Sequence, residues 1–369
     1  MQEINMMEFE FAQDYFEPIK KILRDAKPLI ASSTIEDIYC LERYMLRQEG
    51  LNLNVLIDNN IFTRVVDLAK GNKIPTEEKK AEVYRFCCAV MCFFILGRFN
   101  IEPNIALYEK ASKNSHSQAI EDLYYFRVAD HIHPMGYARL ALGLTNEFSN
   151  KEIQSAKKII DGNFRDTEES SYGKLLDDWK LKYLHLLKVT ALSKDTLEDT
   201  ENARIFLEWI THDCSTSPGS IIFALLFFSP KRSSLPTMIK KINNGNPDTL
   251  IKGIKNAAWD LTYITKYRKL SKNQLEQTIW FFCSNDKLLK IIARTLHLKE
   301  GEKIETAMHS LINYYWGNKK GNKVYKYYNA MEMAISLDEQ ARIIHNRKIG
   351  FQIDQMISEL ESEILTLVR

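Results

Sequence analysis

Hydrophobic positions recur at helical spacing along most of the chain, and this spacing predicts a mainly helical protein. The segment 250–266 is typical, because four of its residues form one helical stripe: Ile254, Ala258, Leu261 and Thr265. Only 14 glycines and 9 prolines interrupt the pattern. Residues 8–49 are expected to form two helices broken near Pro28. Residues 302–369 are expected to form a helical tail with one loop at 316–323.

Two short runs of bulky hydrophobic residues depart from the helical spacing and predict buried parallel strands. They are 53–57 (LNVLI) and 279–283 (IWFFC), and each is followed by polar residues and then a helix-forming segment. Asp58 follows the first run directly, and Asp286 ends the Ser-Asn-Asp turn after the second. Parallel strands end at one edge of a sheet, where open α/β folds bind ligands, so both carboxylates should lie at such an edge. The alternative is an ordinary helix cap, for which aspartate is favoured.

Four segments around these positions resemble the PIN-like family of metal-dependent ribonucleases. The run NVLIDNNIFTRVVDLAKG resembles the family's opening strand and first helix, with the first acidic residue at Asp58. IEPNIALYEKA resembles the segment that supplies a glutamate, at Glu109. KNAAWDLTYI resembles the later acidic helix, with Asp260, and FFCSNDKLLKIIA resembles the last strand and its Thr/Ser-x-Asp turn, with Asp286. The long stretch between Glu109 and Asp260 departs from a compact PIN-like domain and resembles an inserted helical module.

The resemblance implies a helix-rich α/β fold. A small parallel PIN-like sheet would be flanked by helices, and an inserted helical module and a helical C-terminal tail would be added to it. The expected segments are N-terminal helices at 1–50, a nuclease core at 51–117 and 245–300, the helical insertion at 118–244, and the C-terminal helical region at 301–369.

The resemblance also implies a metal-dependent endoribonuclease, in which Asp58, Glu109, Asp260 and Asp286 are the catalytic, metal-binding residues. Converging carboxylates repel one another, and a hard cation such as Mg²⁺ or Mn²⁺ offsets that repulsion by accepting their oxygens. Such a cation lowers the pKa of bound water and stabilises charge on phosphate, so hydrolysis of RNA would need no protein nucleophile. Polar neighbours are expected to orient the ligands, a water or a phosphate: Asn59, Asn256, Ser284 and Asn285.

Composition narrows the function classes only a little. Lys and Arg number 50 against 48 Asp and Glu, so the formal net charge of +2 indicates neither a nucleic acid nor a membrane as partner. The six cysteines form no CxxC pair, which favours reduced core residues. The N-terminal sequence lacks the pattern of a secretory signal, and no apolar run reaches the ~20 residues that span a bilayer. A cytoplasmic location is therefore expected.

Some remaining features have a functional and a structural interpretation. Lysines beside tyrosines could bind an RNA backbone or form a solvated surface: Lys319, Lys320, Lys323 and Lys326. His131 and His133 could bind a metal, but a polar helix end is the favoured interpretation. Asp122 and Asp130 could approach the acidic cluster, but surface charges of helices are the favoured interpretation. Walker, GxSxG and dinucleotide-binding motifs are missing, as is the Arg-to-His spacing of the all-helical HEPN nucleases.

The rival hypothesis is a catalytically inactive helical adaptor or regulatory protein that binds a protein partner. It predicts that the four carboxylates do not converge. The helical additions also suggest regulation of a nuclease by a partner protein or a second copy, as in a toxin or an antiviral defence effector. The RNA target, the choice of RNA over DNA and the activating signal do not follow from the sequence.

Overall fold

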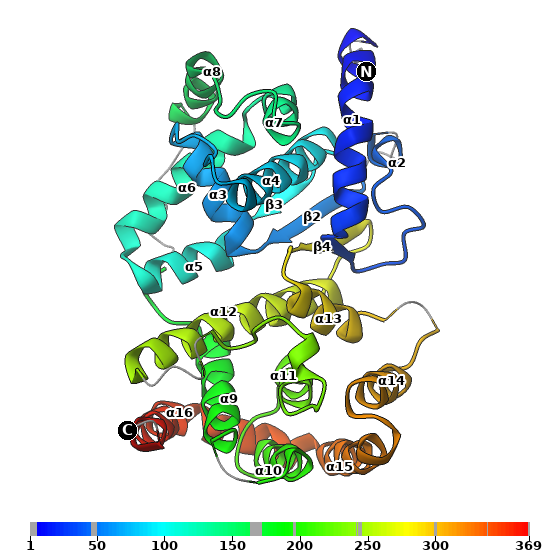
Figure 1. Ribbon diagram of the computed structural model, residues 1–369, viewed down its shortest axis with the longest axis vertical. Helices are drawn as coiled ribbons and strands as arrows, with labels where there is room; N and C mark the ends of the chain where they lie inside the picture. The colour runs from blue at the N-terminus through cyan, green and yellow to red at the C-terminus, as the bar shows by residue number, and fades with distance from the viewer. Residues whose placement is uncertain are drawn as a thin grey trace. The chain divides into compact units, whose positions relative to one another are not determined.

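In the residues that the computed structural model describes, the central element of the fold is a four-stranded sheet. Figure 1 shows this sheet among the helices. The structure describes residues 6–45, 50–162, 172–194, 197–240, 242, 246–298, 301–337 and 339–367. The chain divides into two units. Unit 1 comprises Met1–Lys174 and Leu270–Asn285, and unit 2 comprises Leu175–Lys269 and Asp286–Arg369. The predicted helical insertion at 118–244 is divided between the two units, because residues 118–174 belong to unit 1.

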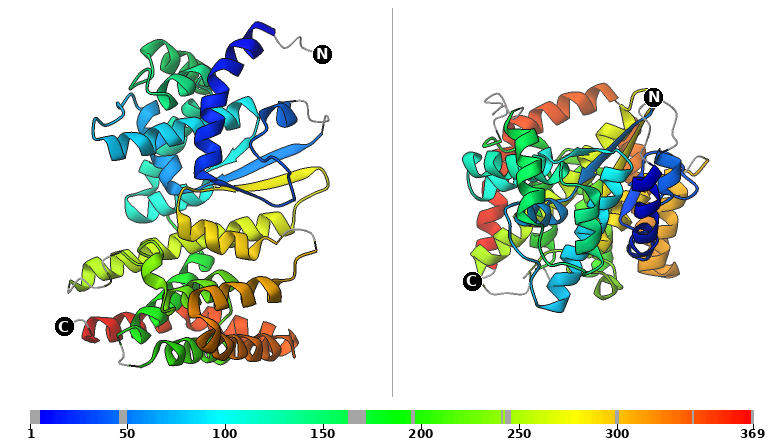
Figure 2. Two further views of the ribbon diagram at one scale, coloured as in Figure 1. Left: turned by 45° about the vertical axis from the view of Figure 1, so that its right-hand side comes forward. Right: turned by 90° about the horizontal axis from the view of Figure 1, so that it is seen from above.

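The sheet lies in unit 1 and is mixed rather than wholly parallel (Figure 2). Its strands are β1 (Leu29–Ala31), β2 (Asn52–Ile57), β3 (Asn100–Glu102) and β4 (Thr278–Cys283), in the order β1-β4-β2-β3. Strand β2 is parallel to both β3 and β4, and β1 is antiparallel to β4. Ile57 pairs with Cys283, so β2 and β4 end at the same level.

Burial explains why the two predicted strand segments form the middle of this sheet. In β2, the last three side chains are fully buried, as are the last three of β4. A strand that is covered on both faces carries a nearly continuous hydrophobic run, which is the pattern of both segments. The prediction of strands at 53–57 and 279–283 is confirmed.

Helices of unit 1 pack around the sheet. They are α1 (Met6–Ala26), α2 (Leu41–Met45), α3 (Asn59–Ala69), α4 (Glu78–Leu96), α5 (Asn104–Lys113), α6 (His116–Asp130), α7 (Pro134–Ala141) and α8 (Asn150–Asp161). Aromatic side chains join several of them to the strands. Phe93 of α4 contacts Phe16 of α1 and Tyr44 of α2, and Tyr44 also contacts Phe281 of β4. The rings form a continuous hydrophobic core between these helices and the sheet.

The predicted second helix of segment 8–49 is wrong for most of its length. The residues after Pro28 form β1 instead, and only the short helix α2 follows. The backbone explains the difference, because the edge of β4 offers hydrogen-bond partners to this segment. Ser32 donates its backbone N–H to the Trp280 carbonyl, and Ser284 donates to the Pro28 carbonyl. Residues 46–49 lie outside the described part of the chain.

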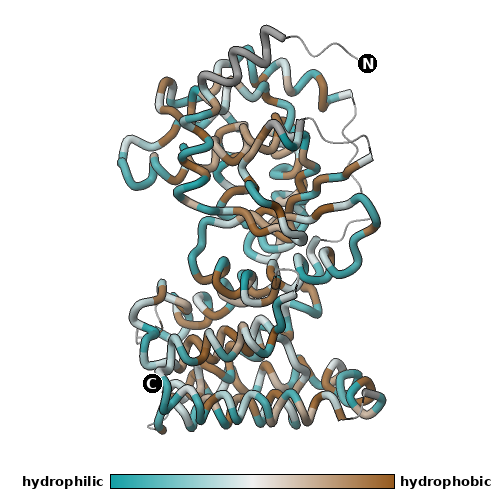
Figure 3. Tube along the Cα trace, turned by 90° about the vertical axis from the view of Figure 1, so that its right-hand side faces the viewer, coloured by the Kyte–Doolittle hydropathy of each residue, from teal (hydrophilic) through white to brown (hydrophobic). Residues whose placement is uncertain are grey.

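Unit 2 is helical in its described residues. Its elements are α9 (Asp177–Leu192), α10 (Asp199–His212), α11 (Pro218–Phe227), the short 3-10 helix η1 (Arg232–Ser234), most of α12 (Pro247–Lys272), α13 (Lys287–Leu296), α14 (Ile304–Trp316), α15 (Asn318–Ser336) and α16 (Glu339–Leu367). Hydrophobic and hydrophilic positions alternate along these helices (Figure 3). Helix α16 packs against α9 through a cluster that contains Leu184, Ile349 and Ile353.

The predicted loop at 316–323 is reduced to one residue. Helix α14 ends at Trp316 and α15 begins at Asn318, with Gly317 between them at a φ of 73°. Glycine adopts this left-handed conformation without steric cost, so a single residue is enough to end one helix and start the next. Within the described ranges, no helix is both long and apolar enough to cross a membrane.

Candidate functional site

Asp58 lies at the carboxyl end of the central strand β2, where it is 2% exposed. Its backbone N–H donates to the Cys283 carbonyl at 3.2 Å, which continues the pairing of β2 with β4 by one residue. Its side chain accepts hydrogen bonds from the Ile61 backbone N–H at 2.9 Å and from the Ser284 hydroxyl at 2.5 Å. The parallel register therefore brings the two predicted strand ends together.

The Ser284 hydroxyl donates a hydrogen bond to the buried Asp58 carboxylate, and we call this contact the clamp. Ser284 is fully buried, and its Oγ donates to Oδ2 of Asp58, while the Ile61 N–H donates to Oδ1. A buried carboxylate is costly unless hydrogen bonds or charges compensate it. Two fixed donors satisfy that need and hold the carboxylate in one orientation. Ser284 was predicted to support the metal ligands; it is hydrogen-bonded to Asp58, and its role beside a bound metal stays a prediction.

Helix capping, the alternative for both aspartates, is observed. Asp58 caps the N-terminus of α3, and Asp286 caps α13 by accepting from the Leu289 backbone N–H at 3.0 Å. A cap does not exclude a further role, because an ionised carboxylate has about four lone-pair sites and a cap uses one. Capping and ligand binding are therefore compatible at Asp58.

Glu109 lies on α5, the helix that follows strand β3. The side chain is buried, and its Oε1 accepts from the Lys113 ammonium at 2.6 Å. Because β3 pairs with β2 in parallel, the connection from β3 into α5 starts at the same edge of the sheet as Asp58. Helices α3 and α5 also contact each other. Asp58 and Glu109 are thus both supplied by the segments that leave this edge.

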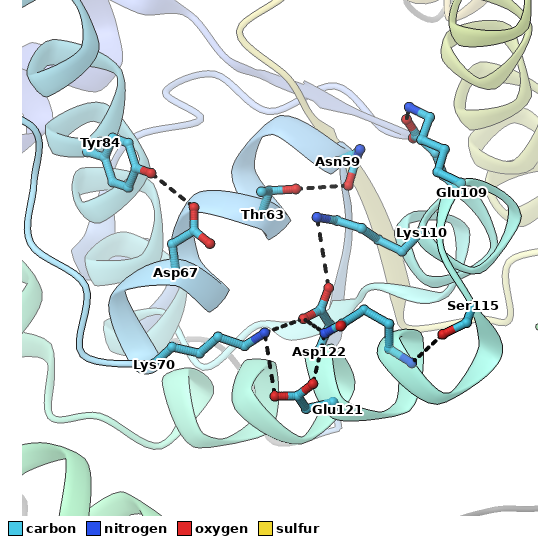
Figure 4. Close-up of polar contacts among 12 residues, drawn as sticks. Asn59, Thr63, Asp67, Lys70, Tyr84, Glu109, Lys110, Ser115, Glu121 and Asp122 are labelled. Carbon is cyan, nitrogen blue, oxygen red and sulfur yellow. Dashed lines mark hydrogen bonds and ion pairs between the residues drawn. The ribbon is translucent and has the colours of Figure 1, made fainter. Parts of the chain in front are cut away.

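A second polar network surrounds Asp122, on the side of α6 that faces α3 and α5 (Figure 4). Asp122 is buried, and Lys70 donates to its Oδ1 at 2.7 Å. Gln118 donates to the same oxygen at 3.3 Å, and the Lys110 ammonium lies 3.8 Å from Oδ2. Burial by itself would lower the pKa of Lys70, but the hydrogen bond and charge of Asp122 outweigh it and raise the pKa. The network thus fixes Lys70, the residue that ends α3, and Lys110, in the last turn of α5.

Asp122 was expected on the surface, and that prediction is wrong. It occupies the buried stripe of α6 together with Ala119 and Phe126, three residues before it and four residues after it. This spacing could have indicated burial from the sequence, because a charged residue within a hydrophobic stripe needs a partner. Asp130 is half-buried, and burial raises the pKa of its carboxyl group.

The other predicted ligands belong to unit 2. Asp260 and Asn256 are half-buried on α12, and Asp286 begins the second part of unit 2. Asp58 and Glu109 belong to unit 1. Within the described ranges, no group of three or more His, Cys, Asp or Glu side chains is arranged to hold a metal ion. Asn59 accepts a hydrogen bond from Thr63 at 3.1 Å (Figure 4). Asn285 is exposed.

The remaining candidates take largely structural positions. His133 accepts from the Met135 backbone N–H at the start of α7, and His131 contacts the Arg127 carbonyl at the end of α6. Both histidines are therefore at helix ends, as the favoured interpretation predicts. The four lysines of α15 are exposed, and the Lys323 ammonium lies 5.9 Å from the centre of the Tyr327 ring. Their RNA contacts stay a prediction.

The cysteines are free thiols, and all but Cys40 are buried. Burial raises the pKa of Cys92 to about 12 and that of Cys214 to about 12. Thiolates are the nucleophilic form, so these residues are inert members of the core at neutral pH. Compared with models of protein families, with curated proteins and with solved structures, the chain matches none.

Proposed function

We propose that this chain is a PIN-like, metal-dependent endoribonuclease with Asp58 at the centre of its active site. The observation that carries the proposal is the hydrogen bond from Ser284 to Asp58, which links the carboxyl ends of two adjacent parallel strands. This edge is where open α/β sheets bind their ligands. A hydroxyl that orients a carboxylate is the kind of outer contact that supports a metal ligand.

The order of the elements supports the same proposal. Strand β2 leads into Asp58. Its parallel neighbour β3 leads into α5, which carries Glu109, and its other parallel neighbour, β4, leads into Ser284. These three connections carry three of the segments that resemble the PIN-like family. Two residues after Ser284, Asp286 completes the Ser-x-Asp turn in the sequence.

The carboxylates of Asp58 and Glu109 are of the ligand type that a hard divalent cation prefers. Mg²⁺ is often held by one or two carboxylates, with waters and substrate phosphate oxygens completing its octahedral shell. Asp58 and Glu109 would be these carboxylates, and Mn²⁺ would be bound by the same oxygens. A bound cation would supply an activated water and stabilise charge on the phosphate. Asp260 and Asp286 enter the proposal as further ligands.

The chain's own groups would prepare this reaction. Ser284 and the Ile61 N–H fix the orientation of the Asp58 carboxylate, so that it need not reorganise when a cation and substrate arrive. Lys113 compensates the buried charge of Glu109 before a cation is bound. Displacement of this lysine by a cation would free it to contact the RNA phosphate.

One observation favours the second candidate function, a catalytically inactive adaptor or regulatory protein. Asp58 and Asp286 both cap helices, a structural role that needs no metal. In this function, the clamp between Ser284 and Asp58 would serve only to join β2, β4 and α3.

Cleavage assays distinguish the two candidates. The purified chain is incubated with a mixed panel of RNA and single-stranded DNA in Mg²⁺, Mn²⁺ or EDTA. Asp58→Asn, Glu109→Gln and Asp286→Asn are compared with wild type and with Glu82→Gln, an exposed acidic position on α4 that serves as the matched control. We expect cleavage of RNA that EDTA abolishes. Asp58→Asn should lower the rate at least about 100-fold, and Glu82→Gln should leave it unchanged.

Folding of each variant is checked by circular dichroism and thermal denaturation. If the wild-type chain cuts no substrate, or if folded Asp58→Asn cuts as fast as wild type, the nuclease proposal is overturned. The adaptor function then becomes the better explanation. Cleavage of DNA in place of RNA would keep the site and change the substrate class.

A further inference from the structure

The two lysines around Asp122 are held in different ways. The Lys70 ammonium donates to Oδ1 of Asp122 at 2.7 Å, and Gln118 donates to the same oxygen at 3.3 Å. The Lys110 ammonium approaches from α5 and lies 3.8 Å from Oδ2 (Figure 4). An N–H···O hydrogen bond is usually about 2.7–3.2 Å long. Asp122 therefore attracts the Lys110 ammonium without taking any of its three hydrogen-bond donors.

The neighbouring lysines form closed ion pairs, which makes the open position of Lys110 distinctive. Lys113, three residues further along α5, lies 2.6 Å from Glu109, and Lys70 lies 2.7 Å from Asp122. Each of these two carboxylates thus has one cation at hydrogen-bond distance. Among these five groups, Lys110 is the surplus cation, so it can bind a further anion.

Burial of Asp122 keeps the Lys110 ammonium in place. The side chain of Asp122 is 6% exposed and that of Lys110 is 18% exposed. A buried carboxylate without a partner is costly, and attraction between charges is stronger away from bulk water. Glu121 lies 3.9 Å from Lys70, but it is 53% exposed, so water and salt screen its charge. Lys110 is therefore already ordered before a ligand binds, which lowers the entropic cost of binding.

Lys110 is adjacent to a carboxylate of the candidate active site. It follows Glu109 directly, and consecutive Cα atoms are about 3.8 Å apart. Helix α5, which carries both residues, contacts α3, the helix that Asp58 caps. Figure 4 shows that Glu109 and Lys110 leave α5 in different directions and that Lys110 points towards α6. A ligand bound at both residues would therefore be an extended one.

The chemistry of these groups favours the phosphates of a nucleic-acid strand. Lysine binds phosphate as a compact point charge. A divalent cation held by Asp58 and Glu109 would bind phosphate oxygens as well. A nucleic-acid strand carries a negative charge on every nucleotide, so the phosphate at the cation has further phosphates on either side of it. The cation and Lys110 would thus recognise two members of the same repeating group.

We propose that Lys110 contacts a phosphate of the RNA backbone close to the phosphate that is cleaved. The inference rests on the nuclease proposal, which sets the position of the cleaved phosphate. Lys110 is then a substrate-binding residue. Asp122 is a positioning residue that acts through Lys110, and Lys70 compensates its charge.

RNA binding is measured separately from cleavage, by fluorescence anisotropy of a labelled single-stranded RNA in EDTA with the full-length chain. Lys110→Met should raise the Kd about five- to tenfold and reduce the slope of log Kd against log salt concentration by about 0.7, the value for one phosphate contact on a single strand. Lys110→Arg keeps the charge and should restore both. Lys79→Met, which removes an exposed lysine of α4, is the matched control and should change neither.

Cleavage kinetics in Mg²⁺ give a second measurement. Lys110→Met should raise KM by a similar factor and leave kcat within about twofold, which is the pattern of lost ground-state binding. In an Asp122→Asn background, the same substitution should raise the Kd for RNA by a smaller factor, because the lysine is no longer held in place. Thermal denaturation verifies folding, and a purely structural role of Lys110 would change the Tm without changing the salt dependence.

The possible outcomes separate this inference from the nuclease proposal. If wild type binds and cuts RNA, and folded Lys110→Met does both equally well, the phosphate contact is overturned while the nuclease proposal stands. If wild type cuts nothing, but Lys110→Met weakens RNA binding with the expected change in slope, the contact stands and the nuclease proposal is overturned. An acidic peptide that binds as tightly as RNA, and loses the same factor in Lys110→Met, would overturn RNA as the ligand.

Discussion

Replacing Ser284 by alanine removes the hydroxyl that donates to the Asp58 carboxylate. The side chain is fully buried, and its Oγ lies 2.5 Å from Oδ2 of the carboxylate. Alanine fits the same space, so the variant leaves one accepting oxygen of a buried charge without this donor. The backbone hydrogen bond from Ser284 to the Pro28 carbonyl is retained.

The expected loss of stability follows from the type of hydrogen bond. A hydrogen bond to a charged group contributes about 1.5–3 kcal/mol, against about 0.5–1.5 kcal/mol for one between neutral groups. We expect Ser284→Ala to lower the free energy of unfolding by about 2 kcal/mol. Ser229→Ala is a suitable control, because Ser229 is also buried but donates to a neutral carbonyl, that of Leu226, at 2.7 Å. It should cost about 1 kcal/mol.

Urea denaturation followed by circular dichroism measures both variants, and hydrogen exchange of the β2 amides locates the effect. Exchange at residues 52–57 should accelerate in Ser284→Ala and stay unchanged in Ser229→Ala. Ser284→Thr keeps a hydroxyl and should restore most of the stability. If Ser284→Ala costs no more than Ser229→Ala, or if β2 exchange is unaffected, the clamp is not holding Asp58. Under the nuclease proposal, the same variant should also lower cleavage by about 10–100-fold.

Two further predictions concern unit 2. Burial lowers the pKa of Lys182 to about 8 from 10.5, so the unfolded chain binds more protons between these pH values and stability should rise as pH increases from 8 to 10.5. Lys182→Met should therefore stabilise the chain by about 1–3 kcal/mol at pH 7 and by little at pH 10.5, as measured by urea titration. Gly253→Ala should destabilise by about 1–3 kcal/mol in the same assay, because its Cβ would lie 2.3 Å from the Lys240 carbonyl oxygen.

Two continuous hydrophobic runs in the sequence predicted the two middle strands of the sheet. The runs that became β2 and β4 are bulky and continuous because both faces of these strands are covered, and such a signal is visible without tertiary information. The same holds for α12, whose hydrophobic stripe was recognised. In contrast, β1 and β3 have three residues each, and they are strands only because β4 and β2 offer them hydrogen-bond partners.

The candidate site was predictable to a similar extent. The sequence placed Asp58 and Ser284 at neighbouring strand ends, and the register of β2 and β4 brings them into contact. It missed the buried carboxylate of Asp122, because the compensating Lys70 is 52 residues away along the chain. Partners at such a separation are set by packing and leave no local pattern. The ligation of a metal by Asp260 and Asp286 stays a prediction.

The position of β4 in the chain sets the order in which the molecule can be built on the ribosome. Ser284 contacts Asp58 across 226 residues of sequence, and the whole first segment of unit 2, Leu175–Lys269, is synthesised in between. At typical rates of translation this takes roughly 10–45 s, during which the backbone groups of β2 that pair with β4 have no strand partner. A chain arrested before residue 278 would contain Asp58 but would have no clamp, so the candidate site is assembled only when most of the protein has been made.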